Sequence, residues 1–387
     1  MNSIVIIGAN EFQNKLILKA KKLGLQTHVF AWKSGAVGEK NADYFYPISI
    51  VEKEKILEEC KRINPIGVCS IGSDLAVPTV NYVANKLKLP SNSNECSKIT
   101  TNKYLMRKIL KKNNLPIPKF KLIKNKNDFM FSDDEFPLIM KPIDRSGSRG
   151  VFLINNKDDF ENLYEKTKSV SFQKNILVEQ FIEGKEYSVE FISQNGKHQY
   201  LQITEKITTN APNFIEKFHF QPAEIQENLK LKVIKILKNA LTALKIKNGA
   251  SHSEIKIFKD NVYIIEIASR MGGDFIGSDL VEYSTGYDYL KNTINVSIGK
   301  KIENFEINKN HYSLSGFIIS KKDKEIFDYI LLNFKNNLKE YNIKSDLNNV
   351  SDSSNRNGYY IMSFEKKDQF DNFIMNLKEM GYNLWQS

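Results

Sequence analysis

The sequence lacks several features that would assign it directly to a common class. No apolar run approaches the roughly 18 residues that a membrane-spanning helix needs. The opening residues, MNSIVIIGAN, lack the basic segment and the small-residue cleavage site of a signal peptide. Only three cysteines occur, Cys60, Cys69 and Cys96, with neither a CxxC pair nor a supporting histidine cluster. Neither a zinc site nor a disulfide framework is indicated. We therefore expect a protein of the reducing cytoplasm without membrane contact.

Two well-known phosphate-binding patterns are also missing. Neither GxxxxGK[ST] nor GxGxxG is present, and the turn at Gly8 has the position but not the spacing of a dinucleotide-binding turn. Arginine is scarce as well, with six among 56 basic residues. In a chain whose usual cation is lysine, an arginine can mark a place that needs a planar guanidinium group with several N–H donors. The formal net charge is +11, but the lysines are dispersed along the chain, which argues against nucleic-acid binding. A basic surface could equally attract ATP or another anion.

The order of apolar runs predicts several modules in 387 residues. Short apolar strands alternate with helices over the first 90 or so residues, which is typical of a parallel α/β domain. From Glu186 the pattern becomes antiparallel, with one long helix at 224–244 and another at 279–298. The predicted divisions are 1–99 (parallel α/β), 100–116 (a connecting helix), 117–183 (a lid), 184–304 (the core) and 305–387 (a small C-terminal α/β module).

Lys141 and the loop that follows it form the first candidate site. Lys141 ends a predicted strand in IMKPIDRSGSRGV, five residues before a Ser-Gly-Ser loop. A lysine can neutralise a polyphosphate here, and glycines let backbone N–H groups approach its oxygens. Ser146 and Ser148 add hydroxyl donors. A flexible hairpin with a surface lysine is the alternative.

A pair of glutamates forms the second candidate site. Glu254 and Glu266 lie on the apolar strands SEIKIF and YIIEIA, which a short turn joins, so they can lie side by side on one sheet face. Two adjacent carboxylates repel each other unless a cation lies between them, and Mg²⁺ bridging phosphate oxygens meets that need. Cross-strand surface charges are the alternative. Arg270 follows in SRMGG and can fork onto a phosphoryl group or a carboxylate.

A third segment, LVEQFIEGKEYSVE at 177–190, runs from an apolar strand into several carboxylates and a glycine turn. Such a connector can read an adenine edge through backbone N–H and C=O groups, while a carboxylate takes the ribose hydroxyls. A solvated hairpin edge is the alternative.

Together, these segments resemble the ATP-grasp superfamily, in its branch of biotin-carboxylase-like enzymes and carboxylate–amine ligases. Five segments carry the resemblance in order, and they span nearly the whole chain: NKYLMR at 102–107, IMKP with SGSRG, VEQFIEGKE, EIASRMGGD, and NRNGYYI at 355–361. The resemblance implies a mixed α/β and α+β ATP-grasp fold. This fold has an N-terminal parallel domain, a mobile lid, an antiparallel-sheet ATP-binding domain and a small C-terminal module.

The resemblance also implies site residues, ATP and Mg²⁺ (or Mn²⁺). Lys103 and Lys141 would contact the α- and β-phosphates, and Arg270 would steady the acyl phosphate or substrate. The remaining implied nucleotide contacts are Ser146, Gly147, Ser148 and Gly150 in the triphosphate loop, Glu179, Gln180, Phe181 and Ile182 around adenine, Glu186 (or else Glu183) on the ribose, and His219 near the nucleotide. Glu254 and Glu266 would bind the metal. The implied partners are a small carboxylate and an amine, with a homodimer plausible.

One position departs from the family pattern, and it keeps rival functions open. The family has Asn two residues after the second metal-binding Glu, whereas this sequence has Ala268, so a water or Ser269 would supply the missing oxygen. We predict a carboxylate–amine ligase that forms an acyl phosphate and releases ADP and phosphate. The alternatives are a carboxylase or formate-type ligase of the same superfamily, or an ATP-binding regulator without turnover, which Ala268 favours.

Overall fold

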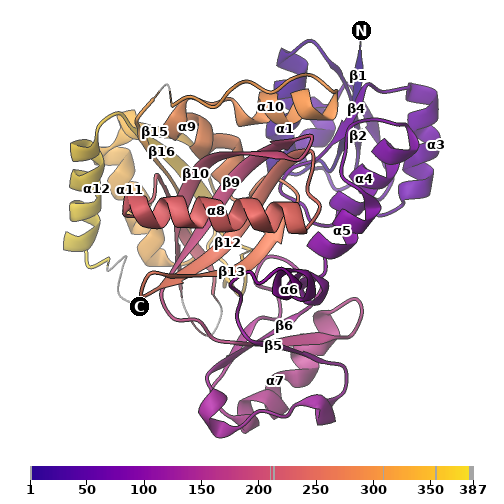
Figure 1. Ribbon diagram of the computed structural model, residues 1–387. Helices are drawn as coiled ribbons and strands as arrows, with labels where there is room; N and C mark the ends of the chain where they lie inside the picture. Colours follow the sequence, from indigo (N-terminus) through magenta and orange to yellow (C-terminus); the bar gives the residue numbers. More distant parts are fainter. Residues whose placement is uncertain (1, 210, 212–213, 308, 354, 383–387) are drawn as a thin grey trace.

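Figure 1 shows the computed structural model, which describes residues 2–209, 211, 214–307, 309–353 and 355–382. The described strands form three sheets, of four, four and eight strands. The predicted combination of a parallel N-terminal sheet with antiparallel sheets is confirmed.

The first sheet is parallel, with the strand order β3-β2-β1-β4. Its elements are β1 (Ser3–Ile7), α1 (Glu11–Lys22), β2 (Gln26–Phe30), α2 (Val37–Asn41), β3 (Tyr44–Tyr46), α3 (Lys53–Ile63), β4 (Gly67–Cys69) and α4 (Val77–Lys86). Strand β1 is central and almost wholly buried, which explains its unbroken apolar run. Gly8 has a φ of 104° at the turn into α1, where Asn10 caps the helix. This turn brings the start of α1 to the edge of the site.

Two short helices connect this domain to the lid. The sequence predicted one helix at 100–113, but the structure has α5 (Asn94–Thr100) and α6 (Lys103–Lys112). The break arises because Asn102 adopts an extended conformation and its side chain accepts a hydrogen bond from Leu105 N at 3.0 Å. The cap therefore places Lys103 at the first turn of α6.

The lid is an antiparallel sheet of order β5-β8-β6-β7 with one helix. Its elements are β5 (Phe120–Ile123), β6 (Leu138–Pro142), β7 (Phe152–Ile154), α7 (Lys157–Val170) and β8 (Ile176–Gln180), with short 3₁₀ turns η1 (Lys126–Asp128) and η2 (Asp133–Glu135). Phe160 and Tyr164 of α7 pack on Met140 and Val178 in a core of its own. The lid is therefore a separate hydrophobic unit below the rest of the molecule in Figure 1.

The third sheet has the order β13-β12-β9-β10-β11-β14-β16-β15. Its strands are β9 (Lys185–Gln194), β10 (Lys197–Thr208), β11 (Glu216–Gln221), β12 (Gly249–Phe258), β13 (Asn261–Ala268), β14 (Tyr312–Phe317), β15 (Leu338–Ile343) and β16 (Gly358–Phe364). The apolar pattern of the sequence did not predict β11. Because β11 pairs with β14, with Phe218 opposite Gly316, the strands of the C-terminal module continue the core sheet across the predicted boundary at 304/305.

The two faces of this sheet differ in polarity. On one face Val189, Phe191 and Ile255 pack under α8 (Glu227–Ala243), which crosses the sheet in Figure 1. The other face carries mostly charged and hydroxyl side chains, since side chains alternate along each strand. In the C-terminal part, α11 (Lys321–Asn333), the 3₁₀ turn η4 (Lys335–Asn337) and α12 (Lys367–Glu379) complete a third core around Phe364.

The predicted helix at 279–298 is interrupted. The structure has a π-helical turn, η3 (Ile276–Leu280), followed by α9 (Val281–Thr285) and α10 (Tyr289–Ser297). Gly286, with a φ of 80°, ends α9, and the Asp288 side chain caps α10 through Lys291 N at 2.9 Å. In the described part of the chain, no helix has the length and apolarity to cross a bilayer. Cys60, Cys69 and Cys96 are buried free thiols.

Candidate functional site

A cavity lies between the lid and the polar face of the eight-stranded sheet. Its walls include Lys141 and the Ser146–Ser148 loop from the lid, and Glu254 and Glu266 from the sheet. The cavity measures about 170 Å³, below the roughly 300 Å³ at which ligand pockets usually begin. Admission of a nucleotide therefore requires the lid to open and some of the ion pairs described below to part.

The structure brings most of the predicted residues to this cavity. Those that line it are Lys103, Lys141, Ser146, Gly147, Ser148, Glu179, Gln180, Phe181, Ile182, Glu186, Glu254, Glu266 and Arg270. Gly150 does not line it. With a φ of 72° it closes the loop, and a Cβ there would lie 3.2 Å from Pro142. His219 faces a neighbouring chamber instead.

Lys103 reaches the cavity from the start of α6. Its ammonium group donates to Glu266 Oε1 at 2.8 Å and to the carbonyl of Arg145 at 2.6 Å. Burial alone would lower the pKa of Lys103, but the carboxylates of Glu266, Asp74 and Glu254 raise it. The side chain is therefore a fixed cation between the sheet and the lid.

Lys141 belongs to a buried cluster around Glu179. The carboxylate of Glu179 forms ion pairs with both Lys141 and Arg107. Burial and the neighbouring cations Arg107 and Lys103 lower the pKa of Lys141, while Glu179 opposes that shift. Lys141 and Arg107 share the single carboxylate of Glu179, which leaves room for a further anion here. The carboxylate of Glu179 already accepts two charged bonds, so only its remaining lone pairs are open to an adenine amino group.

Some backbone N–H and C=O groups at the end of β8 and in the connector that follows it already form hydrogen bonds within the protein. Gln180 N donates to Lys119 O at 2.9 Å and Phe181 N to Pro137 O at 3.3 Å. The Ile182 carbonyl accepts from Lys256 Nζ at 3.1 Å. Among the described residues the Ile182 N–H donates to no backbone carbonyl, so this donor remains for a ligand.

The register confirms that the two glutamates lie side by side. Glu254 on β12 is directly opposite Glu266 on β13, and a bulge follows Glu254. Both carboxylates line the cavity, and such oxygen ligands suit Mg²⁺. Each is already neutralised by a lysine, however. Among the residues that the structure describes, no group of three or more His, Cys, Asp or Glu side chains converges on one point. The residues thus fit a cation held by two carboxylates together with oxygens of the nucleotide.

Ala268 lies one pair further along this register, opposite His252. The hydroxyl of Ser269, which the sequence offered as a substitute ligand, lies 2.9 Å from the hydroxyl of Thr100. Ser269 is therefore engaged elsewhere, and a water is the substitute that remains from the two that the sequence suggested.

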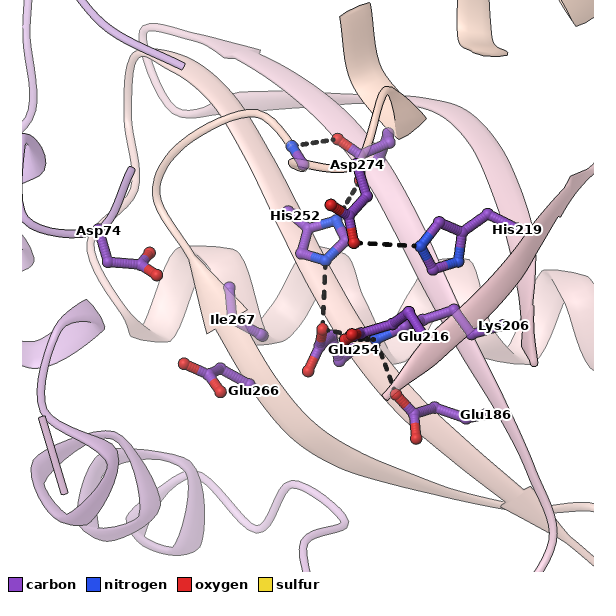
Figure 2. A network of polar contacts seen from close by, with 12 residues as sticks. Asp74, Glu186, Lys206, Glu216, His219, His252, Glu254, Glu266, Ile267 and Asp274 are labelled. Atoms are coloured by element: carbon purple, nitrogen blue, oxygen red, sulfur yellow. Dashed lines mark hydrogen bonds and ion pairs between the residues drawn. The ribbon is translucent and has the colours of Figure 1, made fainter. Parts of the chain in front are cut away.

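Lys206 on β10 is a site residue that the sequence analysis missed. Its Nζ lies 2.8 Å from Glu254 and 2.7 Å from Glu186, with Glu216 at 3.9 Å (Figure 2). Burial would lower its pKa, but these carboxylates raise it well above its usual value. The lysine therefore links the proposed metal ligand Glu254 with the proposed ribose ligand Glu186. Its only sequence signal was its position on an alternating strand, three residues from Ile203.

His252 and Glu190 form a second missed feature. The imidazole Nδ1 forms an ion pair with buried Glu190, and Nε2 faces Glu254 Oε1 at 3.5 Å. The other Glu190 oxygen accepts from Gly272 N at 3.1 Å. A Cβ on Gly272 would lie 2.7 Å from Nδ1, so only glycine permits this contact. Burial lowers the pKa of His252, but Glu190 and Glu254 outweigh it and raise the pKa to about 9.

Arg270 faces an acidic partner from the first domain. Its Nε and Nη2 donate to the two oxygens of Asp74 at 2.8 and 2.9 Å. Burial opposes ionisation of Asp74, yet Arg270 holds its pKa below the usual value. The predicted phosphoryl or carboxylate ligand must therefore use Nη1 or displace Asp74. The pair also joins the loop after β4 to the site.

A second chamber of about 620 Å³ adjoins the cavity and shares Arg270, His252 and Glu254 with it. It lies among the start of α1, the loop after β13 and the C-terminal strands. Asp274, with a φ of 52°, is held there by the guanidinium of Arg356. Figure 2 shows Asp274 beside His219, whose Nε2 lies 3.5 Å from the carboxylate. Arg356 stacks 3.6 Å from the ring centre of Phe317. Burial lowers the pKa of His219, which favours a neutral wall residue.

Sequence and structure comparisons agree with this arrangement. Residues 134–279 match the family model of the ATP-grasp domain. The matched range includes most of the lid, the connector and the paired glutamates, so this part of the chain is an ATP-grasp domain.

Three similar proteins extend the comparison beyond this domain. An alanine–anticapsin ligase of Bacillus subtilis is 25% identical over 269 residues, which is 60% of this chain and 56% of that protein. This chain therefore matches little more than half of the relative's length. The crystal structure of an L-amino acid ligase from Bacillus licheniformis has a TM-score of 0.82 at 22% identity and covers 98% of both chains. An N5-carboxyaminoimidazole synthetase from Staphylococcus aureus, complexed with ADP, has a TM-score of 0.77 at 16% identity over 97% of this chain and 96% of that one.

Proposed function

We propose that this protein is an ATP-dependent carboxylate–amine ligase that forms an amide through an acyl phosphate and releases ADP and phosphate. The observation that carries the proposal is the junction of two cavities. The first has cations and paired carboxylates suited to a nucleotide with its metal. The second is a chamber of substrate size that meets the first at Arg270 and Glu254. The similarity to an alanine–anticapsin ligase supports the same class.

In this proposal the chain's residues divide the binding of ATP. Lys103 and Lys141 face the α- and β-phosphates, and the N–H groups of the Ser146–Ser148 loop face the terminal phosphates. The Gln180 carbonyl and Ile182 N–H face adenine, and Glu186 faces the ribose. Glu254 and Glu266 would hold Mg²⁺, which when bound offsets charge on the phosphate oxygens. Lys103 and Lys206 would then leave these carboxylates for the phosphates.

The chemistry follows from this placement. A carboxylate oxygen of the acid attacks the γ-phosphorus, the bond from that phosphorus to the ADP oxygen breaks, and an acyl phosphate forms. The amine nitrogen then attacks the acyl carbon, phosphate leaves, and the nitrogen loses a proton. Arg270 balances charge on the acyl phosphate, and the closed lid excludes water that would otherwise hydrolyse it.

A phosphate-release screen tests the proposal. Purified protein, ATP and Mg²⁺ are combined with a matrix of small acids and amines, and products are identified by mass spectrometry. The expected result is phosphate release that requires both an acid and an amine, with one amide formed per ADP. Bicarbonate- or formate-dependent release would support the alternative ligase type instead. Tight ATP binding without phosphate release across the matrix would identify a regulator, which Ala268 favours.

A further inference from the structure

We propose that the amine substrate carries a carboxylate, and that Arg149 on the lid binds this carboxylate. The inference rests on the proposed ligase function and specifies its second substrate. The second substrate would thus belong to the class of amino acids, with a guanidinium–carboxylate pair formed across the chamber when the lid is closed.

The arginines near the site differ in their partners. Arginine is rare in this chain, and the others near the site have assigned contacts. Arg107 pairs with Glu179, Arg270 with Asp74 and Arg356 with Asp274. Arg145 lines the first cavity and stacks on the ring of Phe172 at 4.2 Å.

Arg149 differs from the three paired arginines, and it differs from Arg145, which also has no ion pair among the described residues, because Arg145 lines the first cavity and not the chamber. The Nε of Arg149 donates to Ser146 O at 3.0 Å, and no carboxylate of the described residues lies within 4.0 Å of its guanidinium. A guanidinium that is fixed through its Nε and has no acidic partner can bind a carboxylate through two parallel hydrogen bonds.

The position of Arg149 in the loop directs it to the second chamber. Ser146 and Gly147 line both cavities, whereas Arg149 lines the second chamber and not the first. The loop therefore turns its Ser-Gly side to the nucleotide and its arginine to the chamber. Gly150, with a φ of 72°, closes the loop directly after Arg149.

Most charged side chains of the second chamber already have partners of opposite charge. Asp274 and Asp74 are occupied by arginines, and Glu216 contacts Ser353 and lies near Lys206. Lys344 Nζ donates only to the Arg356 carbonyl, at 3.1 Å, among its described contacts. Two cations in the described chamber, Arg149 and Lys344, thus lack an acidic partner. One carboxylate in its described lining, Glu11, accepts a hydrogen bond from Asn342 at 2.8 Å and lacks a basic partner, so the balance still favours an anionic group on the ligand. Lys344 belongs to the C-terminal part of the chain, whereas Arg149 is the unpaired cation that the lid carries into the chamber.

A consequence for the reaction follows from the place of Arg149 on the lid. A carboxylate that pairs with Arg149 would hold the triphosphate loop closed, so the second substrate would promote the closed state in which water is excluded. Removal of the fork should therefore increase ATP hydrolysis that yields no amide.

The test compares matched amines. With ATP, Mg²⁺ and an acid found in the screen held at saturation, KM is measured for L-alanine, L-leucine and L-phenylalanine and for their carboxamides, which lack the anionic group. The variants are Arg149→Met, which removes the charge, and Arg149→Lys, which keeps the charge without the fork. Arg62→Met is the control, because Arg62 is exposed and pairs with Glu59 on α3.

We expect Arg149→Met to raise KM for the amino acids about 10- to 100-fold, as the loss of a charged bidentate contact should. It should leave KM for the carboxamides within about twofold and raise the ratio of ADP to amide. Arg149→Lys should fall between, and Arg62→Met should match the wild type. The dissociation constant of ATP, measured without amine, should be unchanged by Arg149→Met.

Two results would overturn the inference while leaving the ligase function intact. One is equal use of amino acids and carboxamides by the wild type. The other is a weakened ATP affinity in Arg149→Met with an unchanged amine KM, which would make Arg149 a phosphate ligand. Absence of amide and phosphate release with every pair would instead refute the ligase function itself.

Discussion

The buried pair of His252 and Glu190 makes the stability of this protein depend on pH in a defined direction. Glu190 is fully buried and His252 is 6% exposed. The ion pair raises the pKa of His252 from 6.5 to about 9. Because the pKa of the folded state lies above that of the unfolded chain, the stabilisation is fully present below about pH 6.5. It is lost as pH rises through 9.

The size of the effect follows from the pKa values. Each step of one in pKa corresponds to about 1.4 kcal/mol, so the change from 6.5 to about 9 is worth about 3 kcal/mol at most. His252→Gln removes this contribution and leaves Glu190 with Gly272 N as its remaining strong donor. We therefore expect the variant to be less stable than the wild type at pH 6.5 by about 2–4 kcal/mol.

Urea unfolding followed by circular dichroism at several values between pH 6 and pH 10 measures the effect. The wild type should lose stability relative to His252→Gln as pH increases, so the two curves should converge above pH 9. His28→Gln is a matched control, because His28 has a lowered pKa and a hydrogen bond to Tyr46 rather than an ion pair. Parallel pH profiles for the wild type and His252→Gln would show that the imidazole is not held in its charged form by Glu190.

Three further perturbations address the site. Glu266→Gln should abolish ADP release in the presence of both substrates, because one of the two paired carboxylates is lost; normal turnover would disprove the metal assignment. Lys206→Met should lower the melting temperature, since it leaves Glu186, Glu254 and Glu216 without their shared cation. Breaking such a buried pair costs about 3–5 kcal/mol. Added Mg²⁺ should restore more stability to this variant than to the wild type, and an equal response in differential scanning fluorimetry would contradict this account. Gly184→Ala should lower the free energy of unfolding by more than about 1 kcal/mol, the order of a strained backbone position. Gly184 has a φ of 99°, and the new Cβ would lie 2.2 Å from Ile257 O. Gly196→Ala is the control that separates the steric clash from backbone strain, because Gly196 has a φ of 77° but no neighbour within 4 Å.

The sequence by itself determined the order of the strands and helices and most of the residues that line the first cavity. Unbroken apolar runs such as Ile4–Ile7 mark buried parallel strands, while alternation in β9 and β12 assigns one face of each strand to the core. The short turn between β12 and β13 was sufficient to pair Glu254 with Glu266, because register across a hairpin follows from counting. Local patterns of this kind need no information from distant parts of the chain.

Tertiary structure decided the features that depend on distant segments. The partners Asp74 for Arg270 and Arg356 for Asp274 are separated from them by 196 and 82 residues, respectively. His219 joined the second chamber because β11 pairs with β14, and this pairing also merged the C-terminal strands into the core sheet. Lys206 and Glu190 looked like ordinary residues of alternating strands until the neighbouring strands brought opposite charges beside them. Electrostatic energy depends on distance in space, which the order of residues does not specify, so the charge network became visible only in the folded chain.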